Sequence, residues 1–298
     1  MSQSTSEALK NIKNKQRRQK VFAEIKHEKN KDRHTKRAER AKAERLNPEL
    51  KEERLATNIP ETIESKRVFD ETITEEIEGV DEFEQYFGGA LTGEDPKILL
   101  TTSEDAKKAA YEFADILMEF LPNVTFIKRK RNYKIAEICQ FAGNRQYNNV
   151  IVINEDKKKV TGMTFIHLPI GPTFYFSITN IKDAKRIEGH GNATNHIPEL
   201  ILNNFNTRLG KSIGRLFQSI FPKRPEIEGR QVITLHNQRD FIFFRRHRYV
   251  FRSEDKMGLQ ELGPQFTLKL RRMQKGIRGD TVWEHRPDME RDKRKFYI

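Results

Sequence analysis

The chain of 298 residues carries 56 Lys and Arg against 43 Asp and Glu, a net charge of +13 that favours a polyanionic partner. Hydrophobic residues make up 36% and charged residues 33%, which excludes one compact domain throughout and predicts a globular body with solvated segments. No apolar run approaches about 20 residues, no signal-peptide core is present and Cys139 is the single cysteine, so the sequence predicts neither a membrane-spanning nor a secreted chain and excludes an intrachain disulfide.

The first predicted element is a basic arm at residues 1–45, which holds 15 Lys and Arg against 6 Asp and Glu. Helix-forming residues dominate, but the apolar stripe is ragged, so we predict an arm that is disordered or weakly helical when free and folds on a partner. Such clusters also serve as nuclear-import signals, and a merely solvated tail stays open as the alternative. The residues that carry the prediction are Lys15, Arg17, Arg18, Lys20, Lys36 and Arg37.

An acidic linker is predicted at residues 46–95, where single apolar side chains are scattered among Asp and Glu. Such a segment could cover a basic surface of this chain or of another protein, and a flexible linker is an equal alternative. The glycines at 88, 89 and 93 and the proline at 96 place the domain boundary at the end of this segment.

Residues 96–180 read as the first half of an α/β domain, in which short apolar runs alternate with amphipathic stretches. Ser103 is the predicted N-cap of the first helix, which Pro122 ends. Cys139 lies in an apolar pattern and is predicted to be a buried structural thiol. The predicted strands are 97–101, 124–127, 149–153, 161–168 and 173–178, and the predicted helices span 104–120 and 133–141.

Residues 181–276 read as a second half with a long amphipathic helix at 199–220, ended by Phe221 and Pro222. Strands are predicted at 232–235 and 265–270, and two short aromatic strands within 239–251. The four residues Arg245, Arg246, His247 and Arg248, which we call the arginine cluster, stand between these two short strands. The arginine cluster is therefore predicted at a sheet edge, near a hairpin or an irregular corner.

The two halves repeat one order of elements. Each has a helix ending in an apolar residue and proline, then a strand, a strand pair and a Gly-Pro-x-Phe sequence. The last element matches residue by residue, as GPTFYFSI from Gly171 and GPQFTLKL from Gly263. We infer a tandem duplication, with halves at about 96–180 and 181–276 that pack against each other and leave a cleft between them.

The arginine cluster needs counter-charges, because its three guanidinium groups repel one another. A nucleic-acid backbone is the natural source, since the planar arginine fork matches phosphate. Solvation, or pairing with distant carboxylates, is the alternative. For Arg208, Lys211 and Arg215, which lie on one side of the predicted helix, a solvated helix face explains the charges equally well. Tyr133, Tyr147 and Phe174 could stack on unpaired bases, although core packing is preferred for Phe174. The predicted RNA-binding residues are Arg239, Arg245, Arg246, Arg248, Lys269, Arg271, Arg272, Arg208, Lys211 and Arg215.

Four long motifs in this order resemble the Brix domain of eukaryotic ribosome-assembly factors. They are FIHLPIGPTFYF from Phe165, PELILNNFNTRLGKSIGRLFQSIFP from Pro198, GRQVITLHNQRDFIFFRRHRYVF from Gly229 and ELGPQFTLKLRRMQKG from Glu261. The resemblance covers residues 96–276 and leaves 277–298 as a C-terminal extension. It implies a fold of two similar α/β halves, related to the anticodon-binding domains of some tRNA synthetases, in agreement with the duplication.

The same resemblance implies a function. A Brix protein of this kind is expected to bind precursor ribosomal RNA in early large-subunit (60S) particles, in the nucleus and nucleolus. Its expected partners are other large-subunit assembly factors and ribosomal proteins, with no membrane and no small-molecule substrate. The segment from Gly263 corresponds to a family segment likened to a nucleic-acid-binding region of bacterial sigma factors. Many members have Arg where this chain has Gln265, so no phosphate contact is carried onto that position.

An enzyme would need a catalytic constellation that the sequence does not contain, and we predict no enzymatic activity, no cofactor and no metal. Residues 209–212 (LGKS) imitate the end of a phosphate-binding loop, but the first glycine of that motif would be Phe205, and the predicted position is within a helix. Two other functions stay open. One is a protein-interaction scaffold whose RNA contact comes only from the basic arm, and the other is an RNA-remodelling enzyme.

Overall fold

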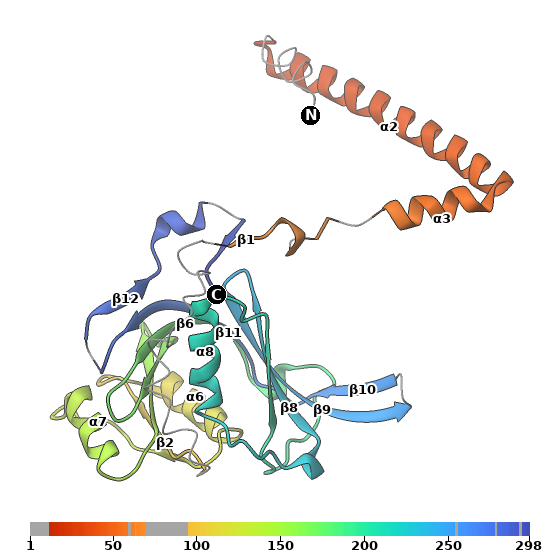
Figure 1. The fold of residues 1–298 in the computed structure, drawn as a ribbon. Helices are drawn as coiled ribbons and strands as arrows, with labels where there is room; N and C mark the ends of the chain where they lie inside the picture. The colour runs from red at the N-terminus through yellow and green to blue at the C-terminus, as the bar shows by residue number, and fades with distance from the viewer. Residues whose placement is uncertain are drawn as a thin grey trace. The chain divides into compact units, whose positions relative to one another are not determined.

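The structure, a computed structural model, shows a chain that divides into two units, Met1–Lys66 and Arg67–Ile298. In the first unit, helix α2 (Lys15–Leu46) is followed by α3 (Pro48–Thr57) (Figure 1). The residues described are 12–58, 61–62, 64–69, 95–253, 256–277, 279–291 and 294–298.

Helix α2 begins after Asn14, whose side chain accepts hydrogen bonds from the main-chain N–H groups of Gln16 and Arg17. No residue of α2 is buried, so helix propensity and this cap hold it rather than packing. The arm is thus helical in the structure. Helix α3 occupies the start of the predicted linker, and Arg54 of α3 pairs with Glu44 of α2 at 2.5 Å. Residues 70–94, including the predicted boundary glycines, lie outside the described residues.

The second unit is built on an 11-stranded mixed sheet in the order β3-β2-β4-β5-β6-β11-β9-β8-β7, with β10 paired to β9 and β12 to β11. A separate two-stranded parallel sheet joins β1 (Val68–Phe69) to β13 (Lys295–Phe296). The strands of the large sheet are β2 (Ile98–Thr102), β3 (Val124–Phe126), β4 (Asn149–Asp156), β5 (Lys159–His167), β6 (Thr173–Lys182), β7 (Glu199–Asn203), β8 (Gln231–Gln238), β9 (Phe241–Ser253), β10 (Lys256–Glu261), β11 (Gln265–Gln274) and β12 (Thr281–Glu284). The helices are α6 (Lys108–Met118), α7 (Ile135–Gly143) and α8 (Arg208–Gln218).

The sheet confirms the predicted pair of similar halves. In each half a parallel pair (β2·β4, β7·β8) is extended by two antiparallel strands (β5 and β6, β9 and β11). Strands β6 and β11 then join the halves through an antiparallel ladder. Gly171 and Gly263 occupy matching turns at φ 120° and 67°, a region that favours glycine. A Cβ atom on Gly171 would lie 2.5 Å from the Cα of Gly276, so this turn also requires a residue without a side chain.

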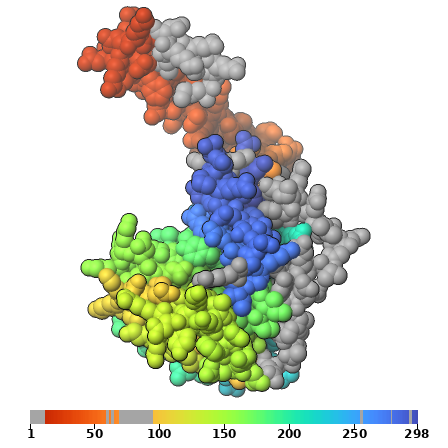
Figure 2. Space-filling view, turned by 90° about the vertical axis from the view of Figure 1, so that its left-hand side faces the viewer, coloured from red at the N-terminus to blue at the C-terminus, as the bar shows by residue number. Residues whose placement is uncertain are grey.

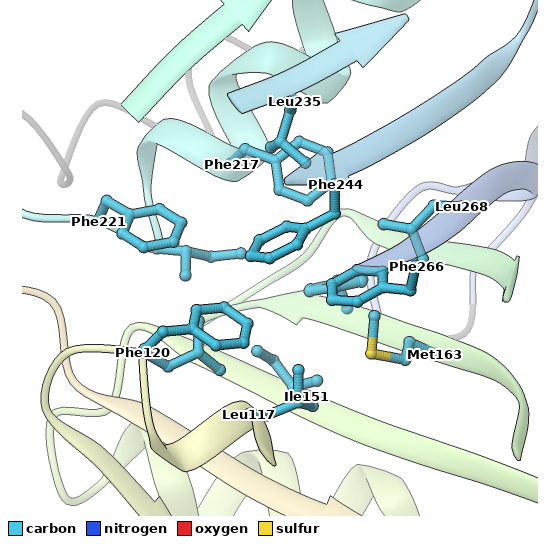
Figure 3. A pocket seen from close by; sticks show the side chains of 13 residues that line it. Leu117, Phe120, Ile151, Met163, Phe217, Phe221, Leu235, Phe244, Phe266 and Leu268 are labelled. Atoms are coloured by element: carbon cyan, nitrogen blue, oxygen red, sulfur yellow. The ribbon is translucent and has the colours of Figure 1, made fainter. Parts of the chain in front are cut away.

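The space between the halves is filled by a common core, where the sequence predicted a cleft. Helices α6 and α8 cover one face of the sheet, and their inward side chains belong to one buried cluster (Figure 1). Phe244 and Phe266 stack at 4.2 Å between ring centroids, with Phe120 and Phe217 beside them (Figure 3). The apolar cavity that these rings line has a volume of only about 30 Å³. Helix α7 covers the opposite face of the first half and buries Cys139, as predicted.

The prediction of one helix over residues 199–220 is wrong. Glu199–Asn203 form strand β7, parallel to β8, and α8 begins only at Arg208. The hydroxyl of Thr207 caps this helix by accepting a hydrogen bond from the N–H of Gly210 at 2.9 Å. Helical spacing of buried residues holds from Leu209 onward, whereas the preceding residues follow the two-residue repeat of a strand at the sheet edge.

Helix α6 also begins later than predicted. Ser103 is not its N-cap, because the helix starts at Lys108. The carboxylate of Glu155, at the end of β4, accepts hydrogen bonds from the main-chain N–H groups of Lys107 and Ala110 at 2.8 and 3.1 Å. A residue about 50 positions away in the chain therefore supplies the acceptor that the sequence assigned to the nearest serine.

The arginine cluster lies in the middle of a strand and not at a junction between two strands. β9 runs without interruption for 13 residues, and its hairpin with β8 turns at Arg239 and Asp240. These two residues have φ of 54° and 61°, so the turn has the paired positive φ angles of a tight hairpin without an Asn-Gly sequence. Cluster side chains therefore alternate between the two faces of the sheet.

The predicted C-terminal extension is part of the folded body. Tyr297 and Ile298 belong to the main core cluster, and Phe296 is buried beside them. The segment that leads to them, dark blue in Figure 2, runs along the surface of the second unit. A strand pairing between β12 and β11 attaches its first part to the sheet. The fold therefore uses residues on both sides of the predicted domain, from Arg67 to Ile298.

Candidate nucleic-acid interface

Helix α2 carries a row of exposed cations along one side. Lys29, Arg33, Lys36, Arg37 and Arg40 line a shallow groove on the helix, with Asp32 at its margin. Their spacing of four, three, one and three residues keeps all five on one face at 100° per residue. We call these five residues the cationic stripe. Regularly spaced charges on an unburied helix are suited to contact several phosphates of a nucleic-acid backbone.

The predicted arm residues divide between the two sides of this helix. Lys36 and Arg37 are members of the cationic stripe, and helical spacing places Lys15 and Arg18 on the same side of the helix. Arg17 and Lys20 lie on the opposite side. With 32 residues, α2 is about 48 Å long, at about 1.5 Å per residue, so its charges can follow an extended backbone.

In the arginine cluster, Arg245 and Arg246 point to opposite faces of the sheet. The Arg245 side chain is about one-third exposed, and its Nε lies 3.9 Å from a carboxylate oxygen of Glu261 on β10. Arg248 is half-buried, opposite Gln231 of β8 and Gln260 of β10 in the ladders. Arg239 is exposed at the tip of the hairpin. These three positions can face a ligand without unfolding the strand.

Arg246 does not belong to that surface, which corrects the prediction that it contacts phosphate. The residue is 1% exposed, and its Nε and Nη2 donate to Oε1 of Gln231 at 3.1 and 2.6 Å. Nη2 also lies 3.4 Å from the main-chain oxygen of Thr194, in the connection between the halves. Burial lowers the pKa of Arg246 to about 10, which still leaves the group charged at neutral pH. Arg246 therefore joins β9 to β8 and to the segment that precedes β7.

Carboxylates and a histidine of the C-terminal segment pair with the predicted RNA-binding residues of β11. The Nζ of Lys269 lies 2.7 Å from Glu290 and over the ring of Phe241, and its side chain is 9% exposed. Arg272 pairs with Glu284 of β12 at 2.6 Å. Arg271 donates to the Oγ of Ser177 at 2.9 Å and to Nδ1 of His285 at 3.2 Å. The tail thus supplies partners to three residues of β11 that were predicted to meet phosphates.

The predicted helix residues form an outward face of α8. Lys211 is exposed and Arg208 and Arg215 are half-buried, whereas the other side of the helix packs into the core. The LGKS sequence lies within a helix, as predicted, but in the first turn of α8, which follows strand β7, and not in the middle of a longer helix. The start of α8 nevertheless contacts the chain itself, since the Thr207 hydroxyl donates to the main-chain oxygen of Tyr297 at 2.8 Å. A Cβ atom on Gly210 would lie 3.1 Å from the carbonyl carbon of Ile298.

Comparison with known proteins places this arrangement in a family. A family model described as the Brix domain matches residues 103–272. The chain belongs to the Brix domain family. It is 63% identical over 289 residues to ribosome production factor 1 of Saccharomyces cerevisiae, covering 97% of this chain and 98% of that protein. The protein of the same name from Pongo abelii is 42% identical over 304 residues, with coverage of 98% and 85%.

A solved structure is also similar to the Brix chain. It is described as a probable ribosomal biogenesis protein from Aeropyrum pernix K1, and it aligns with a TM-score of 0.43 at 12% identity, covering 63% of this chain and 99% of that one. Among the helices of the described residues, none has the length and apolar character to cross a membrane.

His285 lies where the tail contacts the Brix sheet, and we expect it to make this contact dependent on pH. Burial, with Lys269 and Arg271 nearby, lowers the pKa of His285 below its usual value of 6.5, against the opposing charge of Glu290. The unfolded state then binds the proton more tightly, so stability present above pH 6.5 is lost as pH falls toward the folded pKa. We expect the free energy of unfolding to fall between pH 7 and 5.5, with a smaller slope in His285→Asn.

Urea denaturation at each pH measures this slope. His247, whose pKa is also lowered by burial, provides the matched variant His247→Asn. If the free energy of unfolding changes equally with pH in wild type and His285→Asn, the role of His285 is contradicted, whichever result His247→Asn shows.

One group of surface residues was only partly anticipated from the sequence. Tyr133 and Tyr147, predicted as possible base-stacking residues, lie in one groove together with Phe141 and the basic run after β3. Phe174 is fully buried, in agreement with the preference for core packing. The sequence places Phe141 in a helix but does not predict its exposure, because this exposure depends on how much of α7 the sheet covers.

Proposed function

We propose that this Brix protein is a non-enzymatic ribosome-biogenesis factor that binds precursor ribosomal RNA. In this proposal it helps to assemble and process the large-subunit (60S) precursor in the nucleolus, beside other assembly factors and ribosomal proteins. Similarity to proteins named ribosome production factor 1, across nearly the whole chain, supports the process. The cationic stripe of α2 supports RNA as the ligand, since five cations on one side of an unburied helix need counter-charges.

The protein would act by positioning RNA and not by a chemical step. The cationic stripe would follow one stretch of phosphates. Arg239, Arg245 and Arg248 of the second unit would contact others, with Arg245 and Arg248 on opposite faces of the sheet. Such contacts set the register of an RNA chain but do not read its sequence, which suits a factor that holds an immature RNA in place.

A scaffold function, with RNA contact made only by the arm, is the second candidate. The observation that favours it is the pairing of Lys269, Arg271 and Arg272 with the C-terminal segment, together with the burial of Arg246. These contacts remove four of the predicted cations from an open surface or neutralise them. Because every Lys and Arg residue of α2 is exposed, we expect the arm to contribute most of the RNA affinity.

Neutralising the stripe tests the proposal in the full-length protein. In Arg33→Gln/Lys36→Gln/Arg37→Gln/Arg40→Gln, RNA affinity should fall and become less dependent on salt. Removing one phosphate interaction reduces the slope of log K against log salt by about 0.7–0.9. The measurement is fluorescence anisotropy with labelled ribosomal RNA fragments across a salt series.

The helix itself supplies a control with the same change in charge. Arg17→Gln/Lys20→Gln/Lys31→Gln/Lys42→Gln neutralises four cations on the side of α2 away from the stripe. Equal losses in the two variants would show that net charge, and not the stripe, attracts RNA. Affinity unchanged by the stripe variant would move the RNA contact to the second unit.

A further inference from the structure

A groove of about 470 Å³ lies beside α7, on the face of the sheet opposite α6 and α8. Leu99 and Thr101 of β2 form its floor, the chain after β3 forms one wall, and Phe141 and Arg145 at the end of α7 stand on the other. The size of the groove falls within the range of about 300–1,000 Å³ that is typical of small-ligand sites.

Aromatic rings give this groove its character. Tyr133 and Phe141 are each 45% exposed, and their rings meet edge to face with 6.0 Å between centroids. Tyr147 contributes a third ring to the lining. Exposed aromatic faces held in fixed positions are the usual platform on which proteins stack unpaired nucleobases.

The rim of the groove is cationic. Lys128, Lys130 and Arg145 are exposed there, and among the described residues none that lines the groove is acidic. The nearby carboxylates of Glu104 and Asp105 are paired at 2.5 Å with Arg129 and Arg131. A ligand that combines a flat ring with an adjacent negative charge therefore matches both parts of the lining.

Arg129 adds a polar group with an unused donor. Its side chain is 6% exposed, and Nη2 donates to Glu104 and to the main-chain oxygen of Tyr133 at 3.3 Å. Among the described residues, Nε has no hydrogen-bond partner although it is buried. Leaving a buried donor unpaired is costly, so a ligand oxygen that reaches this N–H would stabilise the complex.

We propose that this groove binds an unpaired nucleobase of single-stranded RNA. The base stacks on the exposed face of one of the two rings, Tyr133 or Phe141, and meets the other edge to face, because their planes are 85° apart. The flanking phosphates meet Lys128, Lys130 and Arg145, and an oxygen of the nucleotide accepts from Arg129. The inference rests on the proposed function, since it assumes that the protein binds RNA. It goes further by naming a second site, distant in sequence from α2, that selects single strands because the bases of a duplex are already stacked.

The test uses the full-length protein and two labelled probes, a single-stranded oligouridine of about 12 nucleotides and an RNA duplex of equal length. In Tyr133→Ala/Phe141→Ala, affinity for the single strand should fall roughly tenfold. The salt slope should not change, because stacking releases no counterions. Duplex binding should be unaffected. Photocrosslinking of a 5-iodouridine probe to wild type should modify Tyr133 or Phe141, as located by mass spectrometry.

Two variants serve as controls. Tyr133→Phe keeps the ring and should retain affinity, and Phe251→Ala removes a ring that is 71% exposed on the β9–β10 hairpin, away from the groove. Unchanged single-strand affinity in the double alanine variant would overturn the proposal. A second result would also overturn it. If a glutamate-rich peptide with single leucines binds wild type but not this variant, the groove binds protein and not RNA.

The outcomes also separate this site from the proposed function. If the stripe variant loses RNA and the groove variant does not, only the groove assignment is overturned. If wild type binds neither probe, RNA binding itself is overturned.

Discussion

Deletion of Phe296, Tyr297 and Ile298 is expected to unfold the second unit at room temperature. All three residues are buried, and Tyr297 and Ile298 lie in the main core. Burying one large apolar side chain contributes about 1.5–3 kcal/mol. The loss of three is therefore comparable with the whole stability of a typical domain, about 5–15 kcal/mol. Urea denaturation followed by circular dichroism measures the effect.

Hydrogen bonds to the main chain of the same residues add to this loss. The carboxylate of Asp240, in the β8–β9 turn, accepts from the N–H groups of Tyr297 and Ile298 at 2.8 and 2.9 Å. Asn237 and Arg67 both donate to the main-chain oxygen of Ile298, at 2.8 and 2.7 Å.

The matched controls for the deletion come from these contacts and from an exposed ring. Asp240→Ala should destabilise the fold less than the deletion, and Phe251→Ala, which removes an exposed ring, should have little effect. A deletion variant with the urea midpoint of wild type would show that the tail only lies on the surface.

Replacement of Arg246 by alanine is expected to destabilise the second unit by about 2–4 kcal/mol. The substitution removes a large buried side chain and leaves the buried Oε1 of Gln231 without its donor. The loss is partly offset because the cost of burying the charge disappears. For that reason Arg246→Met, which keeps most of the volume without the charge, should be less destabilising than Arg246→Ala.

Arg245, the adjacent residue in the same strand, provides the control. Its side chain is partly exposed and its carboxylate partner is 3.9 Å away, so Arg245→Ala should change stability by less than about 1 kcal/mol. We expect Arg245→Ala to weaken RNA binding while leaving the urea midpoint near that of wild type. The reverse pattern, with Arg245 needed for stability and Arg246 needed only for RNA, would contradict the assignment of the two side chains.

The contacts of the C-terminal residues show where a fragment of this protein has to begin and end. A fragment of residues 96–276, the extent of the motifs, lacks the core residues Tyr297 and Ile298 and the Arg67 contact to Ile298. Binding studies on such a fragment would measure an unfolded chain. The unit to compare with the full chain is Arg67–Ile298.

The sequence by itself determined the repeated α/β halves, the family and the basic character of the arm. These properties depend on local patterns, because apolar alternation marks strands and because GPTFYFSI and GPQFTLKL repeat residue by residue. The buried strand β2 was predicted to within one residue at each end for the same reason, whereas β4 begins where predicted but runs three residues further. Where a helix start depended on a distant acceptor, as at Glu155 and α6, the local pattern was misleading.

Only the tertiary structure decided which cations are available to a ligand. The sequence shows three arginines in four positions, but strand alternation sends Arg246 into the interior, where Gln231 and Thr194 meet it from other elements. Likewise, Lys269 and Arg272 look free until Glu290 and Glu284 of the tail fold back onto β11. The number of charged residues in a segment can be read from that segment alone. Whether each one is buried or paired depends on residues far apart in the chain that the fold brings together.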